Sequence, residues 1–300
     1  AAPSTMGSQA GKRLDAAAIR GLAARMSFRK PLRAVITGGG GGLGRALAVE
    51  LAGHGAAVVV SDIDPGAAEE TARLVRARGA RAEIVPCDVS DRDAVFALVE
   101  ETERLLGGID FIANNAGVGI GGPFDELSIE DWRWTVDINL WGVIYGCQAA
   151  ISKMKPRQHG YILNVASAAG LLSPPSMSAY NVTKAGVVAL SETLFAEYKS
   201  QGIHVSVLCP TFFKTAIMDS GRGATTEKED NQIRQWMARS KVQAPEVAKN
   251  AIEAVRDGRL YVQPMRDGRT GWRMKRAHPQ RFYETLARAH VKYLAGRNRS

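Results

Sequence analysis

The sequence has 300 residues, of which 45% are hydrophobic, and it carries a formal net charge of +9. This is enough apolar material for one large core or two modest ones, but no apolar run reaches the roughly eighteen residues that span a bilayer. The positive charge is concentrated at the two ends, because residues 1–33 hold seven Lys/Arg against one acid and residues 265–300 hold ten against two. The body between them carries no basic stripe, which argues against nucleic-acid binding.

Cys87, Cys147 and Cys209 each lie in an apolar stretch, and they show neither paired nor metal-ligand spacing. We therefore expect reduced thiols, no metal site and a cytoplasmic location. The first 31 residues contain no apolar block of the length that a secretory signal needs. Residues 1–32 are interpreted as a basic, partly flexible leader, in which 14–28 are compatible with a short helix.

From Arg33 onward, short apolar runs alternate with amphipathic segments. The runs predict buried strands at 34–37, 57–61, 82–87, 109–114, 161–165, 204–209 and 260–262, and the segments predict helices at about 43–54, 65–78, 91–106, 128–154, 178–200 and 244–257. This alternation is typical of βαβ crossovers. We predict an α/β fold, a doubly wound parallel β-sheet (Rossmann fold) of about seven strands with helices on both faces.

One domain is expected over 33–262. Within it, residues 211–243 form a long insertion between the sixth and seventh strands, with a helix predicted near 227–240. Residues 263–300 form a basic C-terminal extension, and from Pro279 its apolar residues follow a helical stripe.

The first strand runs into a glycine-rich turn, TGGGGGLG at 37–44, and a helix starts directly after it. Glycine suits this place because a Cβ would block a tight turn and keep the backbone from a pyrophosphate, which the helix N-terminus then attracts. Two spacings fit, since Gly39, Gly41 and Gly44 match G-x-G-x-x-G while Gly38, Gly42 and Gly44 match G-x-x-x-G-x-G. A merely flexible loop is the alternative.

Asp62 ends the second predicted strand, where a carboxylate can accept hydrogen bonds from adenosine ribose hydroxyls and repel a 2′-phosphate. No Arg or Lys follows it closely, and the turn has no basic residue between Gly38 and Gly44. The sequence therefore favours NAD over NADP. An ordinary turn acid before Pro65 is the other interpretation of Asp62.

Further cofactor contacts are expected at the ends of the third and fourth strands. Asp88 and Val89 would meet the adenine ring, although Asp88 could instead cap the helix that begins near Asp91. The small residues of NNAG would let the backbone lie against the cofactor, while an Asn side chain ties neighbouring strands together. The predicted cofactor contacts are Gly38, Gly42, Leu43, Gly44, Asp62, Asp88, Val89, Asn115, Ala116 and Gly117.

Tyr180 and Lys184 in YNVTK stand at i and i+4 and so share one helix face. A free tyrosine has a pKa of about 10, and a neighbouring ammonium together with a positive nicotinamide would favour its phenolate. Ser167 follows the fifth predicted strand at the carboxyl edge of the sheet, where it could donate to a substrate oxygen. Taken alone, the Tyr–Lys pattern could be a surface pair.

Asn139, in VDINLWG, is predicted to lie in the middle of a helix, where Asn is a mediocre helix former. A buried water relay to Lys184, a kink, or an interhelical hydrogen bond would each explain its presence.

In this order and spacing, TGGGGGLG, Asp62, NNAG, Asn139, Ser167 and YNVTK resemble the short-chain dehydrogenase/reductase family, single-domain type, over residues 33–262. The resemblance implies a catalytic tetrad in which Tyr180 is the acid/base, Ser167 polarises the carbonyl, and Lys184 with Asn139 relays the proton. It also implies that Tyr180 and Lys184 contact the cofactor, Lys184 by bonding the nicotinamide ribose.

The same resemblance implies cofactor contacts at Pro210 and at Thr215, which would meet the nicotinamide carboxamide. It further implies a homotetramer or homodimer built on the helices near 128–154 and 178–200. One departure is Thr211, where the family usually has glycine.

The insertion 211–243 is expected to be a substrate lid over an apolar pocket. Its apolar residues are Phe212, Phe213, Ile217, Met218, Ile233, Trp236 and Met237, and across the cleft lie Val118, Ile120, Leu171, Leu172 and Met177. Some of these could instead pack under the lid or between subunits. An oxidoreductase that moves a hydride between NAD and a hydrophobic secondary alcohol or ketone is predicted, with an NADP-dependent carbonyl reductase and a non-catalytic dinucleotide-binding regulatory protein as alternatives.

The C-terminal stripe is narrow and consists of Phe282, Leu286, Ala289, Tyr293 and Leu294, with Arg281, Arg288 and Lys292 elsewhere. Docking on the acidic body is the favoured interpretation. Packing on a neighbouring subunit and weak association of the basic ends with an anionic membrane surface are the alternatives.

Overall fold

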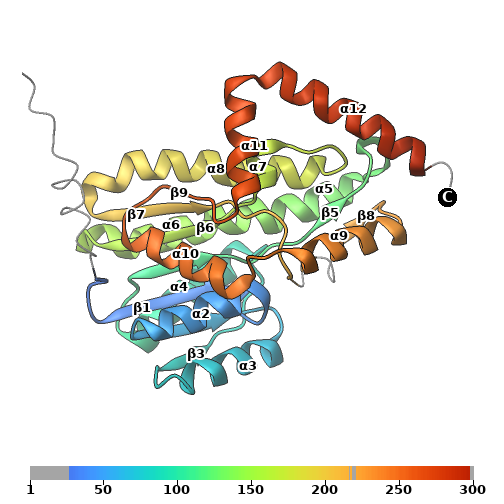
Figure 1. Ribbon diagram of the computed structural model, residues 1–300. Helices are drawn as coiled ribbons and strands as arrows, with labels where there is room; N and C mark the ends of the chain where they lie inside the picture. The colour runs from blue at the N-terminus through green and yellow to red at the C-terminus, as the bar shows by residue number, and fades with distance from the viewer. Residues whose placement is uncertain (1–26, 216, 218–220, 298–300) are drawn as a thin grey trace, which may run out of the picture.

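The computed structural model describes residues 27–215, 217 and 221–297. The predicted leader helix over 14–28 lies, apart from its last two residues, outside them. Seven parallel strands form one sheet in the order β3-β2-β1-β4-β6-β7-β9, as expected for a doubly wound fold (Figure 1). The strands are β1 (Leu32–Thr37), β2 (Ala56–Ser61), β3 (Ala82–Ile84), β4 (Phe111–Asn114), β6 (Gly160–Val165), β7 (Ile203–Leu208) and β9 (Tyr261–Val262).

Helices cover both faces of this sheet. On one face lie α2 (Gly42–Gly53), α3 (Pro65–Arg76) and α10 (Ala244–Arg256), and on the other lie α4 (Arg92–Leu106), α6 (Gly142–Met154) and α8 (Ser178–Tyr198). Successive strand residues alternate between the two cores: Ala34 and Ile36 pack with the first group and Val35 with the second. Because both faces are buried, the strands are continuous apolar runs rather than alternating ones.

Two predicted elements differ from the structure in their extent. The third strand ends at Ile84 rather than at residue 87, although the amides of Val85 and Cys87 still donate to the carbonyl oxygens of Val60 and Asp62. The predicted helix over 128–154 is α5 (Ile129–Val136), one π-helical turn, η2 (Asp137–Trp141), and then α6.

Several short or peripheral elements complete the chain. The insertion contains α9 (Glu227–Arg239) and β8 (Arg222–Gly223), which pairs with β5 (Ile120–Gly121) in a separate two-stranded sheet. The helix α7 (Ala168–Leu172) follows β6 directly. Short 3-10 turns are η1 (Phe124–Glu126), η3 (Lys155–Arg157) and η4 (Lys199–Gln201). The extension forms α11 (Arg266–Ala277) and α12 (Pro279–Arg297), which runs above the body in Figure 1.

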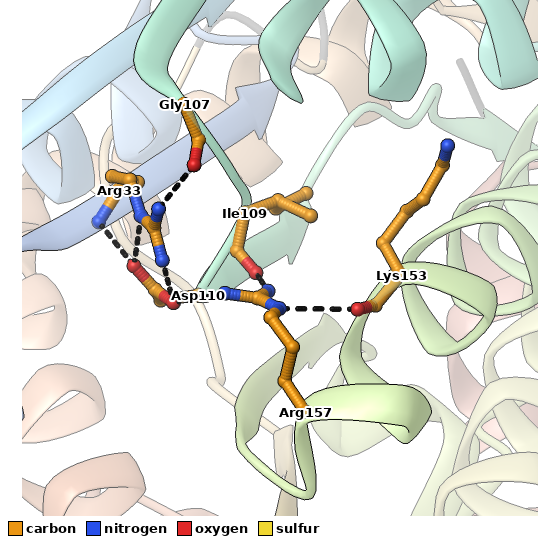
Figure 2. A network of polar contacts seen from close by, with 6 residues as sticks. All are labelled: Arg33, Gly107, Ile109, Asp110, Lys153 and Arg157. Carbon is orange, nitrogen blue, oxygen red and sulfur yellow. Dashed lines mark hydrogen bonds and ion pairs between the residues drawn. The ribbon is translucent and has the colours of Figure 1, made fainter. Parts of the chain in front are cut away.

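A buried ion cluster joins the strands at the edge of the sheet where they begin (Figure 2). Asp110 is 1% exposed and accepts hydrogen bonds from Arg33 Nε at 2.6 Å and from Arg157 Nη1 at 2.8 Å. The two guanidinium groups also donate to the carbonyl oxygens of Gly107 and Ile109. Burial alone would raise the pKa of Asp110, but the hydrogen bonds from both arginines outweigh it and hold this pKa below its usual range.

Among the residues that the structure describes, no helix combines the length and the apolar character that crossing a membrane requires.

Candidate active site

The glycine turn after β1 meets the backbone of the β4 end so closely that side chains are excluded. Gly38 has φ +60°, and a Cβ on it would lie 2.8 Å from Ala116 Cα. Gly42 has φ +49°, and a Cβ on Gly44 would overlap the Gly38 carbonyl oxygen. At Gly41, by contrast, a Cβ would meet nothing within 4 Å. The geometry therefore matches the G-x-x-x-G-x-G spacing through Gly38, Gly42 and Gly44.

The first turn of α2 lies at the end of this glycine turn. Its N-cap is Gly41, and no side chain of the described residues caps it. The first backbone amides of α2, including that of Leu43, therefore have no side-chain acceptor at the N-terminus of the helix. A helix N-terminus of this kind, beside a backbone surface without Cβ atoms, fits the pyrophosphate of a dinucleotide.

Asp62 lies at the end of β2 and is held by two backbone amides. Its Oδ2 accepts from Gly40 N at 2.8 Å and its Oδ1 from Asp64 N at 3.1 Å. The side chain that caps α3 is Asp64, whereas Asp62 bonds to the turn before α3 and to the glycine turn. Arg45, which follows the glycine turn, is directed to Gly40 O and Thr71 Oγ1.

Amide side chains tie the carboxyl ends of β1, β4 and β6 together, as expected for the NNAG segment. Asn115 Nδ2 donates to the carbonyl oxygens of Thr37 and Gly38, both at 2.9 Å. Asn114 Nδ2 donates to Asn164 Oδ1 at 2.8 Å. Thr37 was not a predicted site residue, although a hydroxyl at the end of a buried strand is a signal that the sequence contained.

The capping interpretation of Asp88 is wrong. Asp91 caps α4 through the amides of Asp93 and Ala94. Asp88 instead accepts from the backbone N and the Oγ of Ser90, at 2.9 and 2.7 Å. Val89 is buried, and a Cβ on Gly142 would lie 3.0 Å from it.

Tyr180 and Lys184 lie on the first turns of α8, and both are buried. Lys184 Nζ is 5.6 Å from the centre of the Tyr180 ring and donates to Val165 O at 3.0 Å. Ser167 is the N-cap of α7, its Oγ accepts from Ala169 N at 3.1 Å, and it also forms a hydrogen bond with Tyr180. The structure thus brings three of the four predicted catalytic residues together at the carboxyl edge of the sheet.

Burial dominates the ionisation of this pair. It raises the pKa of Tyr180 to about 12, against a smaller lowering by the Ser167 hydrogen bond. It lowers the pKa of Lys184 to about 8. The protein groups by themselves therefore keep the Tyr180 phenol protonated at neutral pH. Lys184, which was expected to lower the pKa of Tyr180, is not among the groups that do so.

Asn139, the fourth predicted residue, lies in the π-helical turn and is fully buried. Its Nδ2 donates to Val118 O at 2.9 Å and its Oδ1 accepts from Val118 N at 2.8 Å. A Cβ on Gly117 would lie 2.9 Å from Asn139 Oδ1 and 3.4 Å from Lys184 Nζ, so this glycine separates the two polar groups. Two of the explanations considered for Asn139 therefore have a counterpart in the structure, since its helix has an irregular π-helical turn and its side chain bonds to a neighbouring segment. That segment is a loop rather than a second helix.

Of the apolar side chains predicted to line the cleft, Met237 is buried, Val118 and Ile233 are half-buried, and most of the others fall into three groups. Ile120, Met177 and Ile217 pack in a small cluster with Tyr180. Phe213, Leu171 and Leu172 pack with the two sheet cores instead. Phe212 and Trp236 are exposed, with ring centres 5.7 Å apart. Met218 lies outside the described residues.

The segment after β7 closes the site. Pro210 O accepts from Ala168 N at 2.8 Å, and Thr215 Oγ1 accepts from Ile217 N at 3.2 Å. Thr211 Oγ1 donates to Asp267 Oδ1 at 3.1 Å. No group of His, Cys, Asp or Glu in the described part of the chain is arranged to hold a metal ion.

A hollow of about 700 Å³ lies elsewhere, lined by Lys30, His54, Ala56 and Arg78 among others. Because β2 begins at Ala56, this hollow is at the amino edge of the sheet, opposite the tyrosine and the glycine turn. It does not belong to the candidate active site.

A Rossmann sheet with a glycine turn and a Ser–Tyr–Lys group at its carboxyl edge defines a dinucleotide-dependent oxidoreductase. Comparison with known proteins supports the same class of protein. The family model described as short chain dehydrogenase matches residues 33–225. The chain therefore belongs to the short-chain dehydrogenase family.

Among its relatives, a 3beta-hydroxysteroid dehydrogenase 1 of Eggerthella lenta is 37% identical over 185 residues, which cover 61% of this chain and 71% of that protein. A cis-4-hydroxycyclohexanecarboxylate dehydrogenase of Sinomonas cyclohexanicum is 36% identical over 186 residues, or 62% of this chain and 74% of the other. The crystal structure of a short-chain dehydrogenase/reductase from Burkholderia phymatum in complex with NAD is 34% identical, with a TM-score of 0.78, covering 83% of this chain and 95% of that one.

Proposed function

We propose that this protein is an NAD-dependent dehydrogenase that interconverts a hydrophobic secondary alcohol and its ketone, with Tyr180 as the acid/base. The observation that supports this best is the meeting of Ser167, Tyr180 and Lys184 beside a glycine turn that is closed to side chains. Dinucleotide binding alone would not require a phenol beside this serine.

In this proposal each side chain has one task. Ser167 donates to the substrate oxygen, and Tyr180 takes the hydroxyl proton when the alcohol is oxidised. Bound NAD supplies the hydride acceptor and a positive charge on its nicotinamide ring. Lys184, fixed on Val165 O, keeps a second positive charge near the phenol at neutral pH because its pKa of about 8 leaves most of it protonated. The charge of the nicotinamide would offset the burial that disfavours the phenolate.

The cofactor contacts follow from the same geometry. Gly38, Gly42, Leu43 and Gly44 would face the pyrophosphate, and Asp62 would bind the adenosine ribose. The amides of Gly40 and Asp64 already orient that carboxylate, and the Arg45 guanidinium is occupied by Gly40 O and Thr71 Oγ1. This arrangement supports NAD rather than NADP.

The substrate class rests on the apolar cluster around the tyrosine. Ile120, Met177 and Ile217 leave a hydrophobic surface beside the phenol. The names of the two relatives described above each specify a hydroxyl group on a ring. A secondary alcohol on an alicyclic or steroid-like skeleton fits both, with residues 211–243 as the lid over it.

The test is Tyr180→Phe, assayed with a panel of alicyclic secondary alcohols and NAD by the absorbance of the reduced nicotinamide. Removal of the proton acceptor should lower kcat by about 10²- to 10⁴-fold. The Kd for NAD, measured by calorimetry, should change little because the phenol is not a main binding group.

Tyr198→Phe, at the far end of α8, is the matched control and should keep full activity. Turnover by Tyr180→Phe at the wild-type rate would remove this tyrosine from the mechanism. A higher kcat/KM with NADP than with NAD would instead favour the carbonyl reductase alternative.

A further inference from the structure

The short helix α7 carries Ser167 at its amino end and is too small to hold its own position. It has five residues, and a helix of this length is not stable by itself because the unfavourable free energy of nucleation exceeds what its few hydrogen bonds contribute. The Ser167 side chain caps it by accepting from Ala169 N. The place of the Ser167 hydroxyl is therefore set by whatever packs against α7.

The C-terminal extension binds the free carbonyl groups at the other end of α7. Lys275 Nζ donates to Leu171 O at 2.7 Å, and the Tyr283 hydroxyl donates to Leu172 O at 3.3 Å. Lys275 Nζ also lies 5.4 Å from the centre of the Tyr283 ring. The last carbonyls of a helix have no partners within it, and they favour a cation. Lys275 of α11 and Tyr283 of α12 thus supply hydrogen-bond donors to the last carbonyl groups of α7.

Two glycines let α11, which contacts α7, approach it closely; both helices are labelled in Figure 1. A Cβ on Gly268 would lie 2.9 Å from Thr211 Cγ2 and 3.8 Å from Ala168 Cβ, and one on Gly271 would lie 3.2 Å from Leu172 Cδ1. These glycines stand three residues apart and so share one helix face. Thr211, which replaces the usual glycine of the family, is the residue that fits against this face.

We propose that α11 and the start of α12 form a clamp that positions Ser167 for the substrate carbonyl, with Lys275 and Tyr283 as positioning residues. The clamp is defined by Asp267, Gly268, Gly271, Lys275 and Tyr283. This inference rests on the proposed function, because Ser167 must polarise a substrate for its position to matter. A hydrogen bond to a reacting oxygen tolerates little misplacement, so loss of the clamp lowers kcat more than it raises KM.

The experiment uses Lys275→Met and Tyr283→Phe in the full chain. Each variant should lower kcat by about tenfold or more while the Kd for NAD stays unchanged. The acid limb of the kcat–pH profile for alcohol oxidation should also move to higher pH, because a loosened Ser167 gives less support to the Tyr180 phenolate and so raises the pKa of this base. Lys249→Met, an exposed site on α10, is the control and should match the wild type in all three measurements.

Hydrogen–deuterium exchange gives a readout without cofactor or turnover. The amides of Ala169, Gly170 and Ser173 bond within α7, so their exchange should become about tenfold faster in Lys275→Met if the clamp holds this helix. Lys275→Arg keeps a cationic donor and should restore both slow exchange and most of the turnover. A loss in Lys275→Arg as large as in Lys275→Met would overturn the assigned hydrogen bond.

Ser167→Ala separates this inference from the proposed function. If Lys275 acts through Ser167, Lys275→Met should change the residual turnover of Ser167→Ala by less than about twofold. Wild-type turnover in Ser167→Ala alone would refute the proposed function. Loss of turnover in Ser167→Ala, combined with wild-type kcat and exchange in Lys275→Met and Tyr283→Phe, would refute the clamp only.

Discussion

At the level of the single residue, the candidate site is made of polar groups that the protein already orients. The Asp62 carboxylate is held by two amides, and the Lys184 amine by the Val165 carbonyl. A carboxylate and an ammonium can each form further hydrogen bonds beyond these. Such preorganisation reduces the ordering cost that a ligand would otherwise meet on binding.

The first prediction at this scale concerns cofactor choice. Asp62→Ala removes the acceptor proposed for the ribose and the charge that would repel a 2′-phosphate. The ratio of kcat/KM for NAD over NADP should fall by about 10- to 100-fold, which corresponds to roughly 1.4–2.8 kcal/mol. Steady-state kinetics with both coenzymes measures it.

Asp64→Ser is the matched control, because it changes the neighbouring acid but keeps a side chain that can cap α3. It should leave the coenzyme ratio unchanged. An unaltered ratio in Asp62→Ala would show that this carboxylate has only a structural role in the turn.

The residues that the sequence could identify are those whose spacing alone carries chemistry. Tyr180 and Lys184 share a helix face by spacing, and Ser167 follows a strand end, so their meeting was predictable. The partner of Asn139 was not, because Val118 lies 21 residues earlier and the contact depends on the π-helical turn. The sequence indicated only that an asparagine was poorly placed in a helix.

At the level of the element, the segments with a clear apolar pattern were predictable, and the short elements outside the main sheet were not. The six predicted main helices and seven strands correspond to observed elements, because burial on both faces leaves a clear apolar pattern. By contrast β5 and β8 have two residues each and α7 has five, which is too short for any period to emerge. These elements form because of tertiary contacts rather than local preference.

The π-helical turn supplies a prediction at this scale. Asn139→Ala leaves both backbone groups of Val118 without their side-chain partner in a buried place. Unfolding free energy should fall by about 1–3 kcal/mol, and kcat should fall too because the loop beside Gly117 and Lys184 loses its support. Denaturant unfolding and steady-state kinetics measure the two effects.

Gln148→Ala, at an exposed position of α6, is the control and should alter neither quantity. A stable and fully active Asn139→Ala would mean that the π-helical turn holds the loop without this side chain. Turns of this kind recur at functional sites, where an inserted residue reorients its neighbours.

At the level of the whole molecule, the two edges of the sheet have different polar groups and different tasks. The carboxyl edge holds the glycine turn, Asp62, Ser167, Tyr180 and Lys184. The amino edge holds the ion cluster around Asp110, which joins β1 and β4 to the turn after α6 (Figure 2). The sequence could not reveal this cluster, because its members are separated by 77 and 47 positions.

The ion cluster predicts how stability depends on pH. Because the folded pKa of Asp110 is depressed, its contribution is fully present above the unfolded value of about 3.9 and is lost as pH falls through the folded pKa. Asp110→Asn should lower the unfolding free energy by about 3 kcal/mol at pH 7. This deficit relative to the wild type should shrink below about pH 4.

Urea unfolding at a series of pH values checks this result. The Glu101–Arg104 pair offers a matched control, since both groups are exposed and Glu101→Gln should cost much less. A deficit in Asp110→Asn that stays constant into the acid range would contradict the assigned ionisation.

The separation of the two edges has a consequence for how this enzyme could change over evolutionary time. Substitutions far apart with no shared neighbours combine almost additively in their effects. Lineages living at different temperatures could therefore change their stability through the Asp110 edge of the sheet while their catalytic properties change independently at the carboxyl edge. A laboratory library could use the same independence by randomising each edge in a separate round.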